Sequence, residues 1–340
     1  MTEKLNVAVA GATGAVGQAM LEILAERNFP VDRIFPLASE RSAGSTVLFK
    51  NKPVMVEDLA TFDFTKARIG LFSPGAAVSK IYAPRAAEAG CVVIDNTSQF
   101  RYEPEIPLVV PEVNVQAIDG YRRHGIIANP NCSTIQLVVA LKPIYDEVGI
   151  ERINICTYQA VSGAGKPSIE ELASQTAALL SGKNSEPRVL TKQIAFNAIP
   201  HIDVFQENGY TREEMKIVWE TRKILADETI RVNATAVRIP VFYGHSEAVH
   251  LETRKPISAD KAREILAQAP GVQVIDERID GGYPTAVTEA AHADGVFVGR
   301  IRQDISCDRG LNMWIVSDNV RKGAALNTVQ IAEELKNSYL

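Results

Sequence analysis

The chain has 340 residues and a formal net charge of −5, with 46% hydrophobic and 23% charged residues. This composition excludes a chain that is disordered throughout, and the length favours about two domains of roughly 100–200 residues each. Because the charge is mildly acidic and no run of ~20 apolar residues occurs, we expect neither a nucleic acid nor a membrane as partner. The four cysteines lie far apart and lack zinc-ligand spacing, so we expect no metal site and a reducing, cytoplasmic location.

The first predicted elements are a strand, a glycine-rich turn and a helix. An apolar run at 5–10 predicts a buried parallel strand, and the segment GATGAVG at 11–17 follows it directly. A helical pattern then continues to about Asn28. This is the context of a dinucleotide-binding loop, although the spacing is GxxGxxG rather than GxGxxG. Glycines let the backbone approach a pyrophosphate, and the helix N-terminus supplies N–H donors.

The second strand, at 33–38, leads into a loop that bears on the choice of cofactor. An acidic residue at this place binds the ribose 2′-hydroxyl in NAD enzymes, and Glu40 is available for that role. Arg41, flanked by Ser39 and Ser42, suits a 2′-phosphate better because a guanidinium offers a forked set of donors. The loop therefore favours NADP; the alternative is a solvated arginine without a ligand.

Further strands are predicted at 69–73 and 91–94, with a helix between them. Ligands of doubly wound sheets bind beyond the carboxyl ends of the strands, which places Ser73 and the loop 96–101 in the candidate cleft. Arg101 in that loop is a candidate anion ligand. A single loop arginine is more often a surface residue, and both interpretations stay open here.

The segment NPNCST at 129–134 lies between a short strand at 126–128 and a helical pattern. Cys132 therefore stands at the start of a helix, with Ser133 and Thr134 as candidate capping residues. A helix N-terminus favours the thiolate form and offers N–H groups to an oxyanion. Cys132 is the candidate nucleophile. The other cysteines of the apolar strands, at 91 and 156, are expected to be inert.

The second half of the chain predicts an α+β domain. A strand at 153–160 carries Gln159 near its end and leads into the glycine-rich segment 161–166. Ser168 with Glu171, and Thr211 with Glu214, have the spacing of capping boxes and predict two helix starts. On the second helix, Glu220 and Lys223 lie three residues apart, a spacing that by itself indicates a solvated surface pair.

The segment 232–253 predicts two strands separated by a break at Pro240 and Gly244. The first strand carries Arg238. His245 follows the break, and a histidine at a tight turn is expected to face a cleft, which makes it the preferred general base among five histidines. His124 and His250 are expected to be structural, whereas His201 and His292 lie in loops and stay open as alternatives.

A strand at 311–317, the loop residues Asp318 and Asn319, and a helix at 320–335 end the chain. A terminal helix commonly returns to the first domain. We therefore expect a discontinuous nucleotide-binding domain at 1–130 and 318–340, and a second domain at 131–317.

Together these motifs resemble the bacterial aspartate-semialdehyde dehydrogenases over essentially the whole chain. The matching segments are GATGAVG at 11–17, SERSAG at 39–44, DNTSQFR at 95–101, NPNCST at 129–134, QAVSGAGK at 159–166, WETRK at 219–223, RIPVFYGHSEAV at 238–249 and DNVRKGAALNTVQIAE at 318–333. The resemblance implies an α/β fold: a Rossmann-type doubly wound parallel sheet plus an α+β catalytic and dimerisation domain, arranged as in glyceraldehyde-3-phosphate dehydrogenase. It also implies a cytoplasmic homodimer.

The resemblance further implies a reaction and residue roles. The family converts L-aspartyl-4-phosphate to L-aspartate 4-semialdehyde with NADPH, releasing inorganic phosphate, on the route to lysine, methionine, threonine and isoleucine. Cys132 matches the nucleophile, His245 the acid–base group and Gln159 the residue that orients the acyl group, with Asn131 beside the nucleophile. Arg238 and Glu220 match the substrate carboxylate and amine ligands, and Arg101 and Lys223 the phosphate contacts. The residues that match the cofactor site are Gly11, Thr13, Gly14, Ala15, Val16, Ser39, Arg41, Ser42, Ser73, Ser162, Gly163 and Asn319.

Two alternatives remain at this point. An N-acetyl-glutamyl-phosphate reductase shares the fold and chemistry but not the RIPVFYGHSEAV context, and a catalytically silent NADP-binding paralogue would not need Cys132, Gln159 and His245. Glu40 beside the 2′-phosphate motif leaves the strictness of the NADP preference open.

Overall fold

In the computed structural model, which describes residues 3–340, the chain forms two compact units. The first extends to Pro130 and includes Ala324–Leu340, and the second is Asn131–Gly323. The return to the first unit therefore lies at 324 and not at the expected 318. The reason is local: the Asp318 carboxylate accepts the backbone N–H of His292, and the Asn319 amide oxygen accepts that of Gly244, so this loop is held within the second unit.

The first unit is built on a six-stranded, entirely parallel sheet. The strand order is β5-β2-β1-β6-β7-β8, so the chain starts in the middle, builds outward to one edge and then returns to build the other. This is the doubly wound order of the Rossmann fold, which confirms the predicted fold class. The strands are β1 (Leu5–Ala10), β2 (Val31–Ala38), β5 (Glu57–Asp58), β6 (Ile69–Phe72), β7 (Val92–Asp95) and β8 (Ile126–Ala128).

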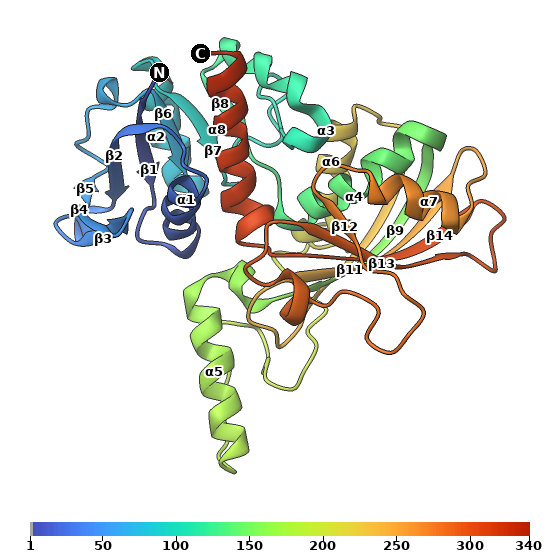
Figure 1. Cartoon of the computed structure of the whole chain (residues 1–340). Helices are drawn as coiled ribbons and strands as arrows, with labels where there is room; N and C mark the ends of the chain where they lie inside the picture. The colour runs from blue at the N-terminus through green and yellow to red at the C-terminus, as the bar shows by residue number, and fades with distance from the viewer. Residues whose placement is uncertain (1–2) are drawn as a thin grey trace. The chain divides into compact units, whose positions relative to one another are not determined.

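Helices cover this sheet because each buries one apolar face. In α1 (Ala15–Glu26) the buried side chains include Met20, Leu21 and Leu24, the positions predicted from the sequence. The terminal helix α8 (Leu326–Ser338) buries Val329, Ala332 and Leu335, and it packs on α1. Figure 1 shows α8 as the red helix beside the blue sheet. The other elements of the unit are α2 (Ala76–Glu88), α3 (Pro111–Asn114) and the hairpin β3 (Thr46–Phe49) and β4 (Lys52–Met55).

The second unit contains a mixed six-stranded sheet in the order β10-β9-β11-β14-β13-β12. The central strands β9, β11 and β14 are antiparallel, whereas each edge strand pairs in parallel with its neighbour. The strands are β9 (Ile150–Gln159), β10 (Arg231–Arg238), β11 (His245–Thr253), β12 (Val272–Val274), β13 (Val296–Gln303) and β14 (Gly310–Ser317). The helices α4 (Cys132–Val148), α6 (Arg212–Leu225) and α7 (Ala259–Ala267) pack against the sheet, which confirms the α+β prediction.

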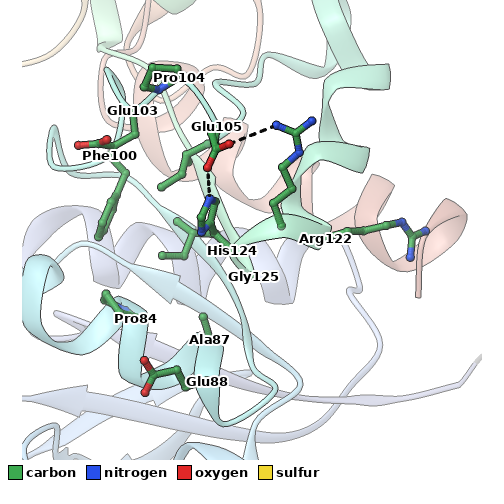
Figure 2. Close-up of a pocket in the computed structure, with 13 residues that line it drawn as sticks. Pro84, Ala87, Glu88, Phe100, Glu103, Pro104, Glu105, Arg122, His124 and Gly125 are labelled. Carbon is green, nitrogen blue, oxygen red and sulfur yellow. Dashed lines mark hydrogen bonds and ion pairs between the residues drawn. The ribbon is translucent and has the colours of Figure 1, made fainter.

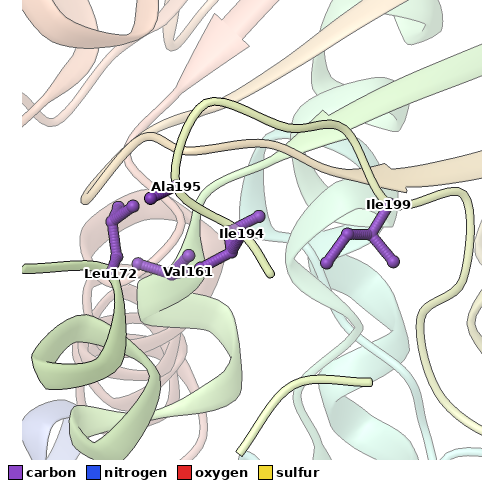
Figure 3. Packing of buried hydrophobic residues seen from close by; sticks show 5 residues of the cluster. All are labelled: Val161, Leu172, Ile194, Ala195 and Ile199. Atoms are coloured by element: carbon purple, nitrogen blue, oxygen red, sulfur yellow. The ribbon is translucent and has the colours of Figure 1, made fainter. Parts of the chain in front are cut away.

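Helix α5 (Lys166–Leu180) extends away from this sheet (Figure 1). Its base packs on a separate apolar cluster of Val161, Leu172, Ile194, Ala195 and Ile199 (Figure 3). In the described residues, no helix combines the length and the apolarity that a membrane span requires.

The capping box predicted at Ser168 and Glu171 is wrong. Helix α5 begins earlier, after Gly165, whose φ of +90° is one that glycine adopts readily. Both residues are buried inside the helix, where the Glu171 carboxylate accepts backbone N–H groups from 188–190. The box predicted at Thr211 and Glu214 is present at the start of α6 and is confirmed.

Candidate functional site

The glycine loop between β1 and α1 has the geometry of a phosphate-binding loop. Gly11 has a φ of +81°, and a Cβ there would lie 2.6 Å from the Ser73 carbonyl oxygen. A Cβ on Gly17 would lie 2.2 Å from the Gly11 oxygen, so this glycine allows helix and strand to pack closely. Gly14 is the N-cap residue of α1 and provides no side-chain cap. The N–H groups at 15 and 16 therefore have no intrahelical acceptor and are available to an anion.

The residues beside this loop lie where the chain reverses direction across the sheet. β1 and β6 are neighbours, and Ser73 follows β6 as Gly11 follows β1. In open α/β sheets this switch point is where ligands bind. After β2, Ser39, Glu40 and Arg41 are exposed and Ser42 is half-buried. Both candidate ribose ligands are thus accessible to solvent.

A chain of amide side chains lies at the same edge of the first sheet. The Asn327 amide donates to Asn129 (2.7 Å), and the Asn129 amide donates to Asn96 (2.7 Å). The Arg101 guanidinium donates to the Asn96 carbonyl oxygen (2.9 Å) and is only 7% exposed. Arg101 is therefore a buried, fixed cation and not the surface residue that was the alternative.

Cys132 is the first residue of α4, as predicted. The cap is provided by Asn131, whose side-chain oxygen accepts the N–H groups of Ser133 (3.0 Å) and Thr134 (3.4 Å). The expectation that Ser133 and Thr134 are the capping groups is therefore wrong. A Cβ on Gly323 would lie 2.8 Å from that of Cys132, so glycine is required beside this cysteine. By contrast, burial raises the pKa of Cys91 to about 12, in agreement with an inert thiol.

Two other predicted catalytic residues, Gln159 and His245, and the predicted substrate ligand Arg238 stand in one row across the second sheet. Arg238 of β10 is in register with Gln159 of β9, and His245 of β11 is in register with Ser317 of β14. Because Ser246 pairs with Tyr158, His245 comes opposite Gln159. The row of Arg238, Gln159, His245 and Ser317 is buried throughout. A one-residue change of register would turn these side chains to the other face.

His245 is fully buried, so the expectation of a histidine exposed to a cleft is wrong. Burial and the positive charge of Arg238 lower its pKa to about 3, against an opposing effect of Glu213. The Ala160 N–H donates to Nδ1 (3.1 Å), which assigns the proton of the neutral ring to Nε2. Nε2 has no protein partner among the described residues, and a Cβ on Gly163 would lie 3.2 Å from it.

Glu213 of α6 belongs to this cluster, although no sequence motif singles it out. One carboxylate oxygen accepts hydrogen bonds from the Asn131 amide (2.9 Å) and the Gln159 amide (3.0 Å), and the other from Lys216 (2.8 Å). Burial alone would raise the pKa of Glu213. The charge and hydrogen bond of Lys216, together with the hydrogen bonds from the Gln159 and Asn131 amides, outweigh this effect and lower the pKa to about 2. Glu213 is thus a buried carboxylate that stays ionised.

Glu220, which the resemblance assigns to the substrate amine, contacts the backbone before α4. Its side chain is fully buried, and one oxygen accepts the backbone N–H of Asn131 (2.6 Å). It therefore fixes the backbone that precedes Cys132. Lys223 lies half-buried near the far end of α6. Glu213 and Lys216 have the same three-residue spacing, seven residues earlier in the helix. In this pair Glu213 accepts the hydrogen bond from Gln159.

The second unit also carries the remaining predicted cofactor residues. The Asn319 side chain bonds the Ser162 hydroxyl and accepts the Gly244 N–H (3.0 Å). Gly163 lies against Arg238 and His245. Arg238 also lines a pocket of about 510 Å³, whose other walls include Ala164 and His201. Ser162, Gly163 and Asn319 are thus placed beside the His245 turn.

A larger pocket, of about 790 Å³, lies on the first unit and contains none of the predicted site residues (Figure 2). There His124 bonds one oxygen of the Glu105 carboxylate (2.9 Å), and the Arg123 guanidinium lies 3.7 Å from the other oxygen.

His250 lies elsewhere, on β11 of the second unit, where it bonds Asp304 and contacts Asn154. Both histidines have the structural roles that were expected.

Two family models match the chain, and together they define its class. The semialdehyde dehydrogenase NAD-binding domain matches residues 6–121, and the semialdehyde dehydrogenase dimerisation domain matches 141–322. The chain thus contains both domains of a semialdehyde dehydrogenase, an oxidoreductase class.

Individual relatives narrow the class. The aspartate-semialdehyde dehydrogenase of Legionella pneumophila is 62% identical over 340 residues, covering 100% of this chain and 98% of that protein. The crystal structure of aspartate semialdehyde dehydrogenase II from Vibrio cholerae, complexed with ASA, has a TM-score of 0.98 at 58% identity and full coverage of both chains. The Candida albicans enzyme, solved with NADP, has a TM-score of 0.79 at 26% identity, covering 98% of this chain and 99% of that one. The chain belongs to the aspartate-semialdehyde dehydrogenase family.

Proposed function

We propose that the chain catalyses the NADPH-dependent reductive dephosphorylation of L-aspartyl-4-phosphate to L-aspartate 4-semialdehyde, with release of inorganic phosphate. The observation that carries the proposal is the connection of Cys132 to the row of Arg238, Gln159 and His245, called the catalytic row below. Gln159 bonds the Ser133 hydroxyl (2.6 Å) and Glu213, and Glu213 bonds Asn131. The residues on both sides of the proposed nucleophile are therefore fixed by polar groups that would also bind a small polar substrate.

The glycine loop fits a dinucleotide, because side chains at Gly11 and Gly17 would collide with backbone atoms and Gly14 leaves the start of α1 open. Gly11, Thr13, Gly14, Ala15 and Val16 would hold the pyrophosphate, and Ser73 lies beside them. Arg41 with Ser39 and Ser42 would hold a 2′-phosphate, which is the basis for proposing NADP rather than NAD. Ser162, Gly163 and Asn319 are proposed as cofactor residues of the second unit. When bound, the reduced nicotinamide supplies a hydride.

Cys132 would act as nucleophile through its thiolate, which the start of α4 favours. Its sulfur forms a bond to the acyl carbon while the bond from that carbon to the phosphate oxygen breaks, and a thioester results. A thioester has a free energy of acyl transfer high enough to form an acyl phosphate in the reverse reaction. A serine ester has a lower one, which would not be enough. Reduction of the thioester and loss of the thiolate then release the aldehyde.

His245 would provide the acid–base function. With Nδ1 occupied by the Ala160 N–H, its Nε2–H group is a hydrogen-bond donor for the carbonyl oxygen on which negative charge develops. Exchange of a proton with the thiol requires the other tautomer, in which the ring gives up the Ala160 bond. Without substrate, the neutral ring carries its proton on Nε2. It would therefore donate a hydrogen bond from Nε2 before it accepts a proton there.

The substrate's charged groups require fixed counter-charges. Arg238 is proposed to bind its carboxylate. Glu213, an ionised carboxylate bonded to Gln159, is proposed to bind its ammonium group in place of Glu220, whose oxygen holds backbone. Lys216 is proposed as the lysine ligand of phosphate in place of Lys223. Arg101 remains the arginine proposed for that anion.

The family model names a dimerisation domain, and we propose a homodimer that forms through the outer face of the second sheet. Cys156, Ala248 and Trp314 lie in register on three neighbouring strands of that face and are half-buried. A thiol nucleophile needs reducing conditions, so the cytoplasm is the proposed location.

The deciding experiment follows absorbance at the nicotinamide band with aspartate semialdehyde and NADP, with and without inorganic phosphate. We expect phosphate-dependent NADPH formation that Cys132→Ala abolishes, while NADP binding stays near the wild-type value. An active alanine variant contradicts the nucleophile assignment. Activity on N-acetyl-glutamate semialdehyde alone would indicate the related reductase, and binding of NADP without turnover would indicate a silent paralogue.

A further inference from the structure

Glu247 is a buried carboxyl group for which the reaction above has no use. It lies on β11 and is 0% exposed. Neither of its oxygens has a hydrogen bond of normal geometry to the described residues. Burying a carboxyl group without full pairing is costly, so its presence requires an explanation.

The position of Glu247 relates it to the catalytic row. It stands two residues after His245 on the same strand, and Thr157, its partner on β9, stands two residues before Gln159. Side chains two apart on a strand point to the same face. Gln136 follows Cys132 by four residues on α4, which is one helical turn. Thr157 and Glu247 therefore form a second polar row next to Gln159 and His245, and Gln136 lies one turn along α4 from Cys132.

The surroundings of Glu247 keep it uncharged. Burial raises its pKa well above the usual value, and only the neighbouring Gln136 side chain acts in the opposite direction. Its partners across the sheet, Thr157 and Ile315, carry no charge. A carboxylic acid has one O–H donor and one C=O acceptor, which match the C=O and N–H₂ of a primary amide. Both polar atoms of Gln136 are likewise buried, and neither has a hydrogen bond of normal geometry among the described residues.

We propose that Glu247 is a positioning residue that pairs, as a neutral carboxylic acid, with the Gln136 amide. The pair joins the first turns of α4 to β11, and so fixes Cys132 relative to His245. A carboxylate at this place would add negative charge near the nucleophile and oppose the thiolate. The neutral acid gives the same support without that charge. The proposal rests on the roles proposed above for Cys132 and His245.

The test compares Glu247→Gln, which keeps a polar pair without a titratable proton, with Glu247→Leu, which removes it. For each we would measure kcat, KM, the melting temperature, and the rate of Cys132 alkylation by iodoacetamide against pH. We expect Glu247→Gln to stay within about threefold of wild type. Glu247→Leu should lower kcat and alkylation on the order of ten- to a hundredfold, as small displacements of reacting groups do, with KM little changed. Val249→Ala, one row below on β11, is the matched control and should leave the alkylation profile unchanged.

A second pair of variants keeps the test decisive if Glu247→Leu does not fold. Gln136→Glu places two carboxyl groups together and should slow alkylation, and adding Glu247→Gln restores one acid and one amide in exchanged positions. Recovery of alkylation and kcat in this double variant is the expected result. Equal loss in Glu247→Gln and Glu247→Leu, or no recovery in the exchanged pair, overturns the proposal. Alkylation needs no substrate, so it separates this outcome from failure of the proposed reaction.

Discussion

At the scale of single residues, the burial of His245 makes the free energy of unfolding depend on pH. Its pKa is about 3 in the folded chain against an ordinary value of 6.5, so between these values the unfolded chain binds the additional proton. The contribution of the neutral His245 to the free energy of unfolding is therefore fully present above about pH 7, and it decreases as the pH is lowered through 6.5. From the two pKa values we expect a loss of about 2 kcal/mol at pH 5.

Urea unfolding of wild type and His245→Gln at pH 7.5 and 5.0 measures this effect. The free energy of unfolding should decrease between pH 7.5 and pH 5.0 by about 2 kcal/mol less in the variant than in wild type. Glu213, with a pKa of about 2, loses its contribution only at lower pH and does not interfere. Turnover of the same variant should fall by ~10²–10⁴-fold, the range for loss of a general acid–base group. Identical pH dependence in both proteins would contradict the buried neutral ring.

Glu213 accepts hydrogen bonds from side-chain amides, whereas Glu220 accepts one from the Asn131 backbone, so we expect different effects on catalysis. Glu213→Gln removes the negative charge beside Gln159, so we expect kcat/KM for aspartate semialdehyde to fall about ten- to a hundredfold. Glu220→Gln keeps an oxygen that accepts the Asn131 N–H, and activity should stay within a few-fold of wild type. Steady-state kinetics of the two variants gives the order. The reverse order would restore Glu220 to the substrate site.

At the scale of elements, the N-terminus of α4 depends on one side chain. Asn131 caps the helix and also donates to Glu213. Asn131→Ala should lower the free energy of unfolding by about 1 kcal/mol, a usual cost of losing a cap, and should slow Cys132 alkylation. Thr211→Ala removes the cap of α6 at a similar cost and is the control. Equal alkylation rates in the two variants would show that the Asn131 cap does not act on the thiol.

Several elements of this site were predictable from local sequence, and the failures have physical causes. The strands, the glycine loop and the start of α4 depend on hydrophobic runs and helix-start residues that lie together in the chain. Glu213 was missed because a helix repeats its faces every seven residues, so its pair with Lys216 has the same spacing as Glu220 with Lys223. The burial of His245 was missed because the residues that enclose it, including Gly163, come from a segment about eighty positions away.

At the scale of the whole molecule, the outer face of the second sheet carries the proposed dimer contact. Ala248→Glu places a charge between Cys156 and Trp314, and in a symmetric interface each copy carries the same change. We expect a largely monomeric protein, since buried unpaired charge costs several kcal/mol. Ala267→Glu, the same substitution at an exposed position of α7, which packs on α4, should leave the dimer intact. Light scattering after gel filtration distinguishes these results, and a dimeric Ala248→Glu would place the contact elsewhere.

The arrangement of Arg238, Gln159 and His245 in one row also limits how the gene can change. Loss or gain of a single codon inside β9 or β11 would reverse the facing of every side chain beyond it and remove the reactive groups together. The surface turn at 39–44, which carries the proposed 2′-phosphate ligands, imposes no such constraint, because a change in its length leaves the strands in register. Length variation among descendants of this sequence should therefore collect in turns of that kind, while these two strands keep their number of residues.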